Sequence, residues 1–137
     1  MAFETLHGIV VKYSDYKESD RVMSVLTVER GLVTLTARGC RKKGSSIAAS
    51  CEICAYSEFV IFNRVGVDTI STATLLESFY PIREDYEKYE SAEQVLHLSK
   101  KLTYLSNRWD DAFKLCYYTL SFIAYTDNNP IDLELCF

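Results

Sequence analysis

The sequence has few of the features that would place the protein in a membrane, in a secretory pathway or among enzymes. Across its 137 residues no run approaches the ~18 apolar residues of a membrane span, and the N-terminus lacks a signal-peptide pattern. No internal repeat or low-complexity run is present. The two histidines, His7 and His97, have no nucleophile or carboxylate pattern that would suggest catalysis. We therefore expect a soluble, cytoplasmic protein that is not an enzyme.

Cysteine is present, but not in the pattern of a disulfide framework or a zinc site. Five cysteines, an odd number, are typical of reduced thiols where no secretory signal is found. Cys51 and Cys54 have the spacing of a metal or redox pair. We expect them at the start of a strand, where residues three apart point to opposite faces, and no second pair follows. We interpret both as structural thiols and expect no metal and no cofactor.

The charge is unevenly distributed along the chain. The apolar fraction of 48% is enough for one buried core, or for a small domain with an appendage. The net charge is −4, yet residues 1–50 carry eight Lys and Arg against five Asp and Glu, and residues 51–137 carry seven against fourteen. Such asymmetry hints at one face for nucleic acid and another for a different partner.

The order of apolar patterns predicts strands first and helices second. β-branched and aromatic runs predict strands at 6–13, 22–28, 32–37, 53–62 and 67–75. Gly8 suggests a bulge or bend in the first strand, and Gly31 a hairpin turn that needs positive φ. After Pro81 the apolar spacing becomes helical, over 84–105 and again over 110–125.

Five short strands with glycine bends favour a small closed barrel, and the five-stranded barrel that most often has a nucleic-acid face is the OB-fold. We therefore predict a β+α protein: a five-stranded OB-fold barrel over residues 1–80, followed by a small antiparallel helical appendage over 81–137. In such barrels, aromatic and cationic side chains on a sheet face and its loops hold bases and phosphates.

A basic segment, residues 34–46, begins within the third predicted strand and continues past its end. It contains Arg38, Arg41, Lys42 and Lys43 with no acid among them, and Gly39 and Gly44 bracket the last three of these cations. Lys and Arg at a strand end suit phosphate groups, which they neutralise without reading sequence. A solvated loop that keeps the surface polar is the alternative interpretation.

Several short motifs, taken together, resemble those of the RecO family of bacterial recombination mediators. They are Gly8-Ile9-Val10-Val11, Tyr16-x-Glu18-Ser19-Asp20-Arg21, Thr27-x-x-x-Gly31-Leu32, Ala37-x-Gly39-x-Arg41 with Ser45, and Ser71-Thr72-Ala73-x-Leu75. The resemblance extends into the helix expected over 85–105 and so covers nearly the whole chain.

The resemblance implies an N-terminal OB-fold that binds single- and double-stranded DNA in DNA repair. Family members anneal complementary strands and, with RecR, help to load RecA onto DNA coated by single-strand-binding protein. On this basis the expected DNA-binding residues are Lys12, Arg21, Arg38, Arg41, Lys42, Lys43 and Ser45. An alternative from another class is a protein-docking module that binds RecR and touches DNA weakly or only with that partner.

The end of the sequence differs from the family pattern. The family continues into a zinc-binding segment with further cysteines, and the stretch from Pro130 to Cys136 resembles the start of that segment. Because Cys136 has no cysteine after it, we expect no zinc. If further helices normally cover 117–137, apolar side chains there should be exposed or buried by self-association.

Overall fold

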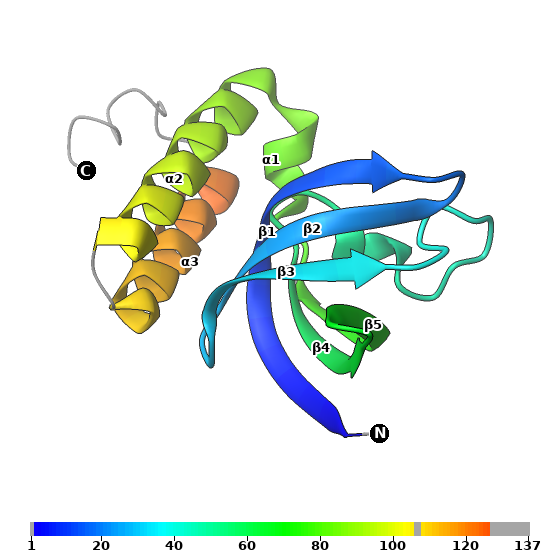
Figure 1. The fold of residues 1–137 in the computed structure, drawn as a ribbon. Coiled ribbons are helices and arrows are strands. Elements are labelled where there is room, and N and C mark those ends of the chain that lie inside the picture. Colours follow the sequence, from blue (N-terminus) through cyan, green and yellow to red (C-terminus); the bar gives the residue numbers. More distant parts are fainter. Residues whose placement is uncertain (1, 106–107, 127–137) are drawn as a thin grey trace.

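The computed structural model describes residues 2–105 and 108–126. Five strands come first and three α-helices follow (Figure 1). The strands are β1 (Phe3–Tyr16), β2 (Asp20–Thr27), β3 (Gly31–Ala37), β4 (Tyr56–Arg64) and β5 (Val67–Glu77). The helices are the 3-10 turn η1 (Ala48–Cys51), then α1 (Tyr80–Glu84), α2 (Tyr86–Leu105) and α3 (Trp109–Tyr125). The order of strands is as the sequence predicts, whereas the helices begin at Tyr80 and not after Pro81.

The strands close into a barrel in the order β1-β2-β3-β5-β4. Every neighbouring pair is antiparallel except β3 and β5, which are parallel and meet at Thr36 and Thr69. The length of β1 allows the barrel to close, because its first half pairs with β4 and its second half pairs with β2. This arrangement of five strands confirms the predicted OB-fold barrel.

Gly8 lies where β1 passes between both of its neighbours, opposite Thr27 and Ser57. A Cβ at this position would come within 2.6 Å of the Val25 side chain and 2.9 Å of the Leu26 carbonyl oxygen. Glycine is therefore required for close approach of the backbones. The bulge that we expected at Gly8 falls further along, between Val10 and Lys12.

Two clusters of buried side chains hold the molecule together. The barrel core fills the inside of the barrel and consists of Leu6, Val10, Met23, Val25, Leu35, Ala37, Cys40, Ile47, Cys51, Phe59, Ile61 and Ile70. The interface core lies between barrel and helices and consists of Ile9, Val11, Leu26, Cys54, Phe79, Ile82, Ala92, Val95, Leu96, Phe113, Cys116, Leu120, Ile123 and Ala124. Since burying one large apolar side chain contributes about 1.5–3 kcal/mol, the interface core fixes the helices to the barrel.

Two predicted boundaries are wrong. The strand predicted from residue 53 begins at Tyr56, because Ala48–Cys51 form a 3-10 turn and Cys54 has a φ of +68°. The helix predicted from residue 84 is divided at Asp85, whose backbone is extended. The Asp85 carboxylate accepts hydrogen bonds from the backbone N–H groups of Glu87 (3.0 Å) and Lys88 (3.3 Å), so it caps α2 rather than lying within it.

The two longer helices lie side by side and run in opposite directions (Figure 1). The predicted end of the second helix at residues 127–130 lies outside the described residues. Within the described part of the chain, no helix is both long and apolar enough to cross a bilayer.

Candidate nucleic-acid interface

The basic loop, residues 38–46, is anchored to the turn between β1 and β2. The Gly39 backbone N–H donates to the Asp20 carboxylate (2.7 Å), and the Arg41 backbone N–H donates to the Ser19 carbonyl (3.0 Å). Gly39 and Gly44 adopt φ values of +70° and +82°, which glycine tolerates at no steric cost. The spacing between Ser19-Asp20 and Gly39-x-Arg41 therefore has a structural reason: each motif holds the other in place.

Arg41 uses its side chain to fix this anchor. Its guanidinium donates to the backbone carbonyls of Lys17 (2.9 Å) and Asp20 (3.3 Å), and it lies 3.5 Å from the carboxylate of Asp15. The Tyr16 carbonyl, at 3.5 Å, is a fourth acceptor, so the end of β1, the turn and the start of β2 together surround one guanidinium. Arg41 is better described as a clamp on the loop than as a free phosphate ligand.

Arg21 is likewise engaged within the protein. Its Nε is 3.0 Å from the Asp15 carboxylate, its Nη1 donates to the Cys51 carbonyl (2.8 Å), and its guanidinium lies 4.0 Å from the centre of the Tyr13 ring. Burial works to lower the pKa of Arg21, but the hydrogen bond to Asp15 and the neighbouring charges raise it overall. The side chain is only 13% exposed, so the cation is permanent and mostly covered.

Three of the predicted residues remain available to a ligand. Arg38, Lys42 and Lys43 are exposed, and none forms an ion pair with any acid in the described part of the chain. Ser45 is half-buried, and its hydroxyl accepts a hydrogen bond from the Ile47 N–H (3.3 Å), which turns the loop back toward the barrel. Three unpaired cations on an anchored loop can contact phosphate without first breaking internal ion pairs.

Lys12 is separate from this group. It is exposed on β1, opposite Ser24 of β2, and faces a hollow beside α2. The structure therefore divides the seven predicted residues into three groups. Arg38, Lys42 and Lys43 are free on the loop, Arg21, Arg41 and Ser45 are engaged within the protein, and Lys12 lies apart.

The sheet face that OB-folds commonly use for ligands is partly covered here. α3 packs Phe113, Cys116 and Leu120 into the interface core with Ile9 and Leu26 of β1 and β2. At the start of α3, the Trp109 ring lies 3.2 Å from where a Cβ on Gly31 would be. The part of that face beneath α3 is therefore not accessible to a ligand.

The Cys51 and Cys54 side chains belong to different cores, one inside the barrel and one beneath the helices. Burial raises the pKa of each thiol to about 12, and both remain protonated at neutral pH. The reason for their opposite directions is the 3-10 turn and not the strand that we predicted. Among the described residues, no three His, Cys, Asp or Glu side chains are grouped as metal ligands, and Cys136 lies outside those residues.

The expected self-association also concerns α3. Leu115, Tyr118, Phe122 and Tyr125 recur every three or four residues, lie on one face and are exposed. Self-association stays a prediction, and residues 127–137 lie outside the described residues.

Comparison with known sequences identifies the family. The sequence model described as "Recombination protein O N terminal" matches residues 1–79, more than half of the chain. The chain belongs to the RecO family. The match ends at the residue before α1, so it covers the barrel and the basic loop.

Individual relatives extend the similarity into the helices. The DNA repair protein RecO of Acetivibrio thermocellus is 27% identical over 130 residues, which is 95% of this chain and 52% of that protein. The DNA repair protein RecO of Halalkalibacterium halodurans is 29% identical over 121 residues, 88% of this chain and 48% of that protein. The DNA repair protein RecO of Symbiobacterium thermophilum is 27% identical over 137 residues, which is 100% of this chain and 54% of that protein. The chain spans about half the length of these relatives.

Proposed function

We propose that this chain is a DNA-binding protein of recombinational repair, which contacts phosphate groups through Arg38, Lys42 and Lys43 on the basic loop. The observation that carries the proposal is the contrast within the loop. Arg41 and Asp20 hold it in place, while three neighbouring cations form no ion pair with residues 2–105 or 108–126. A preformed cationic loop loses little conformational freedom on binding and so favours association. The names of its relatives agree with a role in DNA repair.

The more detailed activity that we propose is the one that the resemblance to the RecO family implies. The chain binds single- and double-stranded DNA, promotes annealing and, with RecR, assists RecA loading on DNA that carries single-strand-binding protein. It works by binding rather than by catalysis. Each of these partners and activities is part of the proposal.

A salt titration tests the loop directly. Each phosphate contact on a single strand contributes about 0.7 to the slope of log affinity against log salt. Replacing Lys42 and Lys43 together by Gln should therefore make that slope shallower by up to about 1.4. Arg64 and Lys114 are also exposed, so the R64Q/K114Q variant makes the same charge change elsewhere and should leave the slope nearly unchanged.

The alternative is a protein-docking module that binds RecR. Two observations favour it: residues 51–137 have seven basic against fourteen acidic side chains, and α3 has the exposed apolar face described above. If the K42Q/K43Q variant folds and keeps both the DNA affinity and the slope of the wild type, the loop does not bind phosphate. Loss of RecR binding in that variant would then assign the loop to docking.

A further inference from the structure

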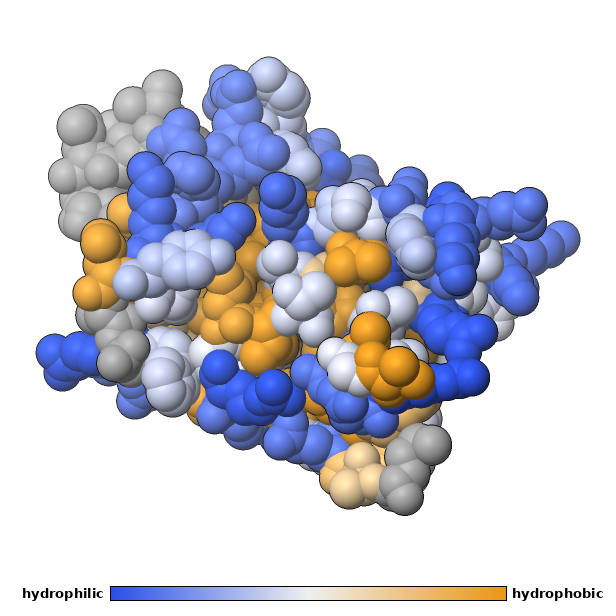
Figure 2. Space-filling view, viewed as in Figure 1, coloured by the Kyte–Doolittle hydropathy of each residue, from blue (hydrophilic) through white to orange (hydrophobic). Residues whose placement is uncertain are grey.

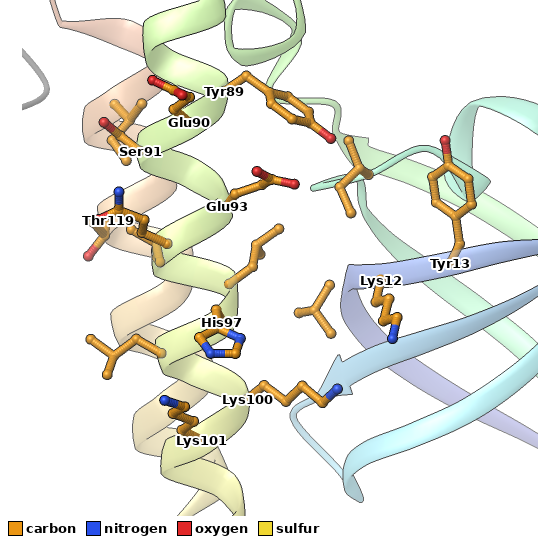
Figure 3. Close-up of a pocket in the computed structure, with 17 residues that line it drawn as sticks. Lys12, Tyr13, Tyr89, Glu90, Ser91, Glu93, His97, Lys100, Lys101 and Thr119 are labelled. Atoms are coloured by element: carbon orange, nitrogen blue, oxygen red, sulfur yellow. The ribbon is translucent and has the colours of Figure 1, made fainter.

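A hollow of about 1150 Å³ runs along α2, and one arm of it separates α2 from β1 (Figure 3). We call this arm the α2–β1 groove and define it by Lys12, Tyr13, Ile53, Tyr89, Glu93 and Lys100. Apolar side chains are visible at its floor between more polar walls (Figure 2). The whole hollow is slightly larger than the about 300–1,000 Å³ of small-molecule pockets, and the α2–β1 groove is one part of it.

The helix α2 and the strand β1 each contribute one aromatic and one cationic side chain to the groove. On α2, Tyr89, Glu93 and Lys100 follow one another at helical spacing and point toward the barrel (Figure 3). On β1, Tyr13 and Lys12 point in opposite directions along the groove (Figure 3). The result is an aromatic end with two tyrosines and a cationic end with two lysines.

Tyr89 of α2 and Tyr13 of β1 lie on opposite walls of the aromatic end (Figure 3). Burial raises the pKa of the Tyr89 phenol, and the charges of Glu93, Cys54 and Tyr13 contribute in the same direction. Tyr89 is only partly buried, packed against the interface core, so the position of the ring is fixed while part of it remains accessible. A fixed, accessible aromatic ring is a stacking platform for an unpaired base.

The positive charges at the cationic end are not neutralised by ion pairs within the described residues. Neither Lys12 nor Lys100 forms an ion pair with an acid in the described part of the chain. Two ammonium groups that point into one hollow repel each other, and a bound phosphate would relieve that repulsion. Glu93, between the two ends, offers an acceptor for the amino group of a base such as cytosine.

The groove is connected to the basic loop through a chain of contacts. Arg41, on the loop, lies against Asp15; Asp15 pairs with Arg21; and Arg21 lies on the ring of Tyr13, which lines the groove. The more usual sheet face is partly covered by α3, so the groove is the neighbouring surface that still offers both stacking and cationic groups.

We propose that the α2–β1 groove binds unpaired nucleotides of a DNA strand held at the basic loop, with a base on Tyr89 and phosphate at Lys12 and Lys100. This proposal rests on the proposed function, since it assigns a second section of the same DNA path. The proposal also implies that the groove binds single strands and not duplexes, because the bases of a duplex stay stacked on one another.

The deciding experiment measures the affinity of the purified chain for a labelled oligothymidine and for a blunt-ended duplex of two fully paired strands. Tyr89→Leu keeps apolar packing but removes the aromatic face, and it should weaken single-strand binding about fivefold or more. Tyr89→Phe keeps the ring and should bind like the wild type. Both variants should bind the duplex as the wild type does, which a general loss of structure would not allow.

A second measurement does not depend on the folding of any variant. Light-induced crosslinking of a strand containing iodouracil to the wild-type chain should attach it to the peptide that contains Tyr89 or to the one that contains Tyr13. In parallel, K12Q/K100Q should reduce the single-strand salt slope by up to about 1.4, while R64Q/K114Q should not.

The outcomes separate the two proposals. If K42Q/K43Q weakens binding to both DNA forms while Y89L and K12Q/K100Q change neither and no crosslink reaches the two tyrosines, the loop proposal stands and the groove proposal is overturned. The same result would favour a peptide as the occupant of the groove. If the wild-type chain binds neither form of DNA, both proposals are overturned together.

Discussion

Arg41 and Lys43 carry the same charge two positions apart, but their surroundings give them different tasks. Arg41 is a planar fork that donates to the Lys17 and Asp20 carbonyls, while Lys43 extends into solvent. Guanidinium suits the first role because its donors are held in a fixed plane. A lysine on a flexible stem suits the second, because it can follow a moving phosphate.

The contrast between these two residues gives a stability prediction. Arg41→Ala removes the donors that hold the loop, and a lost charged hydrogen bond at a partly exposed site should cost about 1–2 kcal/mol. For a chain of this size that corresponds to a Tm lower by about 3–8 °C. Thermal unfolding followed by circular dichroism would measure it.

Lys43→Ala is the matched control, because it removes a side chain of the same charge from the same loop. It should change the stability by less than about 0.5 kcal/mol. Equal melting temperatures for the two variants would show that Arg41 does not hold the loop.

The residues of the site could be predicted from sequence only in part. Charge and glycine spacing identified the loop, because both are local. The engagement of Arg21 with Cys51 could not be predicted, since 30 residues separate them and only the folded barrel brings them together. Tyr89 and Lys100 were missed for the same reason: their helix pattern indicates packing, and Lys12 joins them only through the fold.

At the scale of elements, α3 is the helix that links the two parts of the molecule. Its inner face supplies Leu120, which is 0% exposed, and its outer face supplies Tyr118, which is 68% exposed. The periodicity over 110–125 predicted the helix because apolar side chains recur at helical spacing. The stripe that carries it, Phe113, Cys116, Leu120 and Ile123, is the face that the structure buries.

The strands were predictable for a different reason. β-branched runs between turn residues, as at 22–28 and 32–37, have no competing helical interpretation. The stretch from Ile53 to Ala55 was misassigned because a turn whose side chains are buried is as apolar as a strand. Only the positive φ of Cys54 distinguishes this turn from a strand, and a cysteine in the sequence does not predict a positive φ.

The prediction at this scale concerns shared stability. Leu120→Ala should destabilise the whole chain by about 2–5 kcal/mol, because it opens a cavity in the interface core. Urea unfolding should still show one transition by both far-ultraviolet circular dichroism and Trp109 fluorescence. Tyr118→Ala, on the outer face of the same helix, should cost far less. Separate transitions for the two probes would mean that barrel and helices unfold independently.

At the scale of the whole molecule, the interface core makes the loop and the groove parts of one body. The barrel contributes the loop, Lys12 and Tyr13, and α2 contributes Tyr89 and Lys100. If the helices moved freely, the groove would have no fixed width and could not act as a stacking platform. The buried side chains of α2 and α3 are therefore a condition for the proposed DNA path as well as for stability.

The same burial makes the stability of the molecule depend on alkaline pH. Burial raises the pKa of Cys51, Cys54 and Cys116 to about 12, from the 9.0 of an ordinary thiol. Burial, together with the hydrogen bond to Glu77, raises the pKa of Tyr125 to about 12 from 10.0. In each case the unfolded chain releases its proton at a lower pH than the folded chain does.

Unfolding is therefore favoured once the pH exceeds the unfolded values. Stability from these four groups is fully present below about pH 9 and is lost progressively as the pH rises toward about 12. The urea midpoint should hold steady between about pH 7 and pH 8.5 and fall clearly by about pH 10.5. Cys116→Ala is the informative variant, since it lowers stability at every pH through its cavity but removes one titrating thiol. Its midpoint should decline less steeply above about pH 9 than that of the wild type, and an identical decline would exclude the Cys116 thiol as a cause.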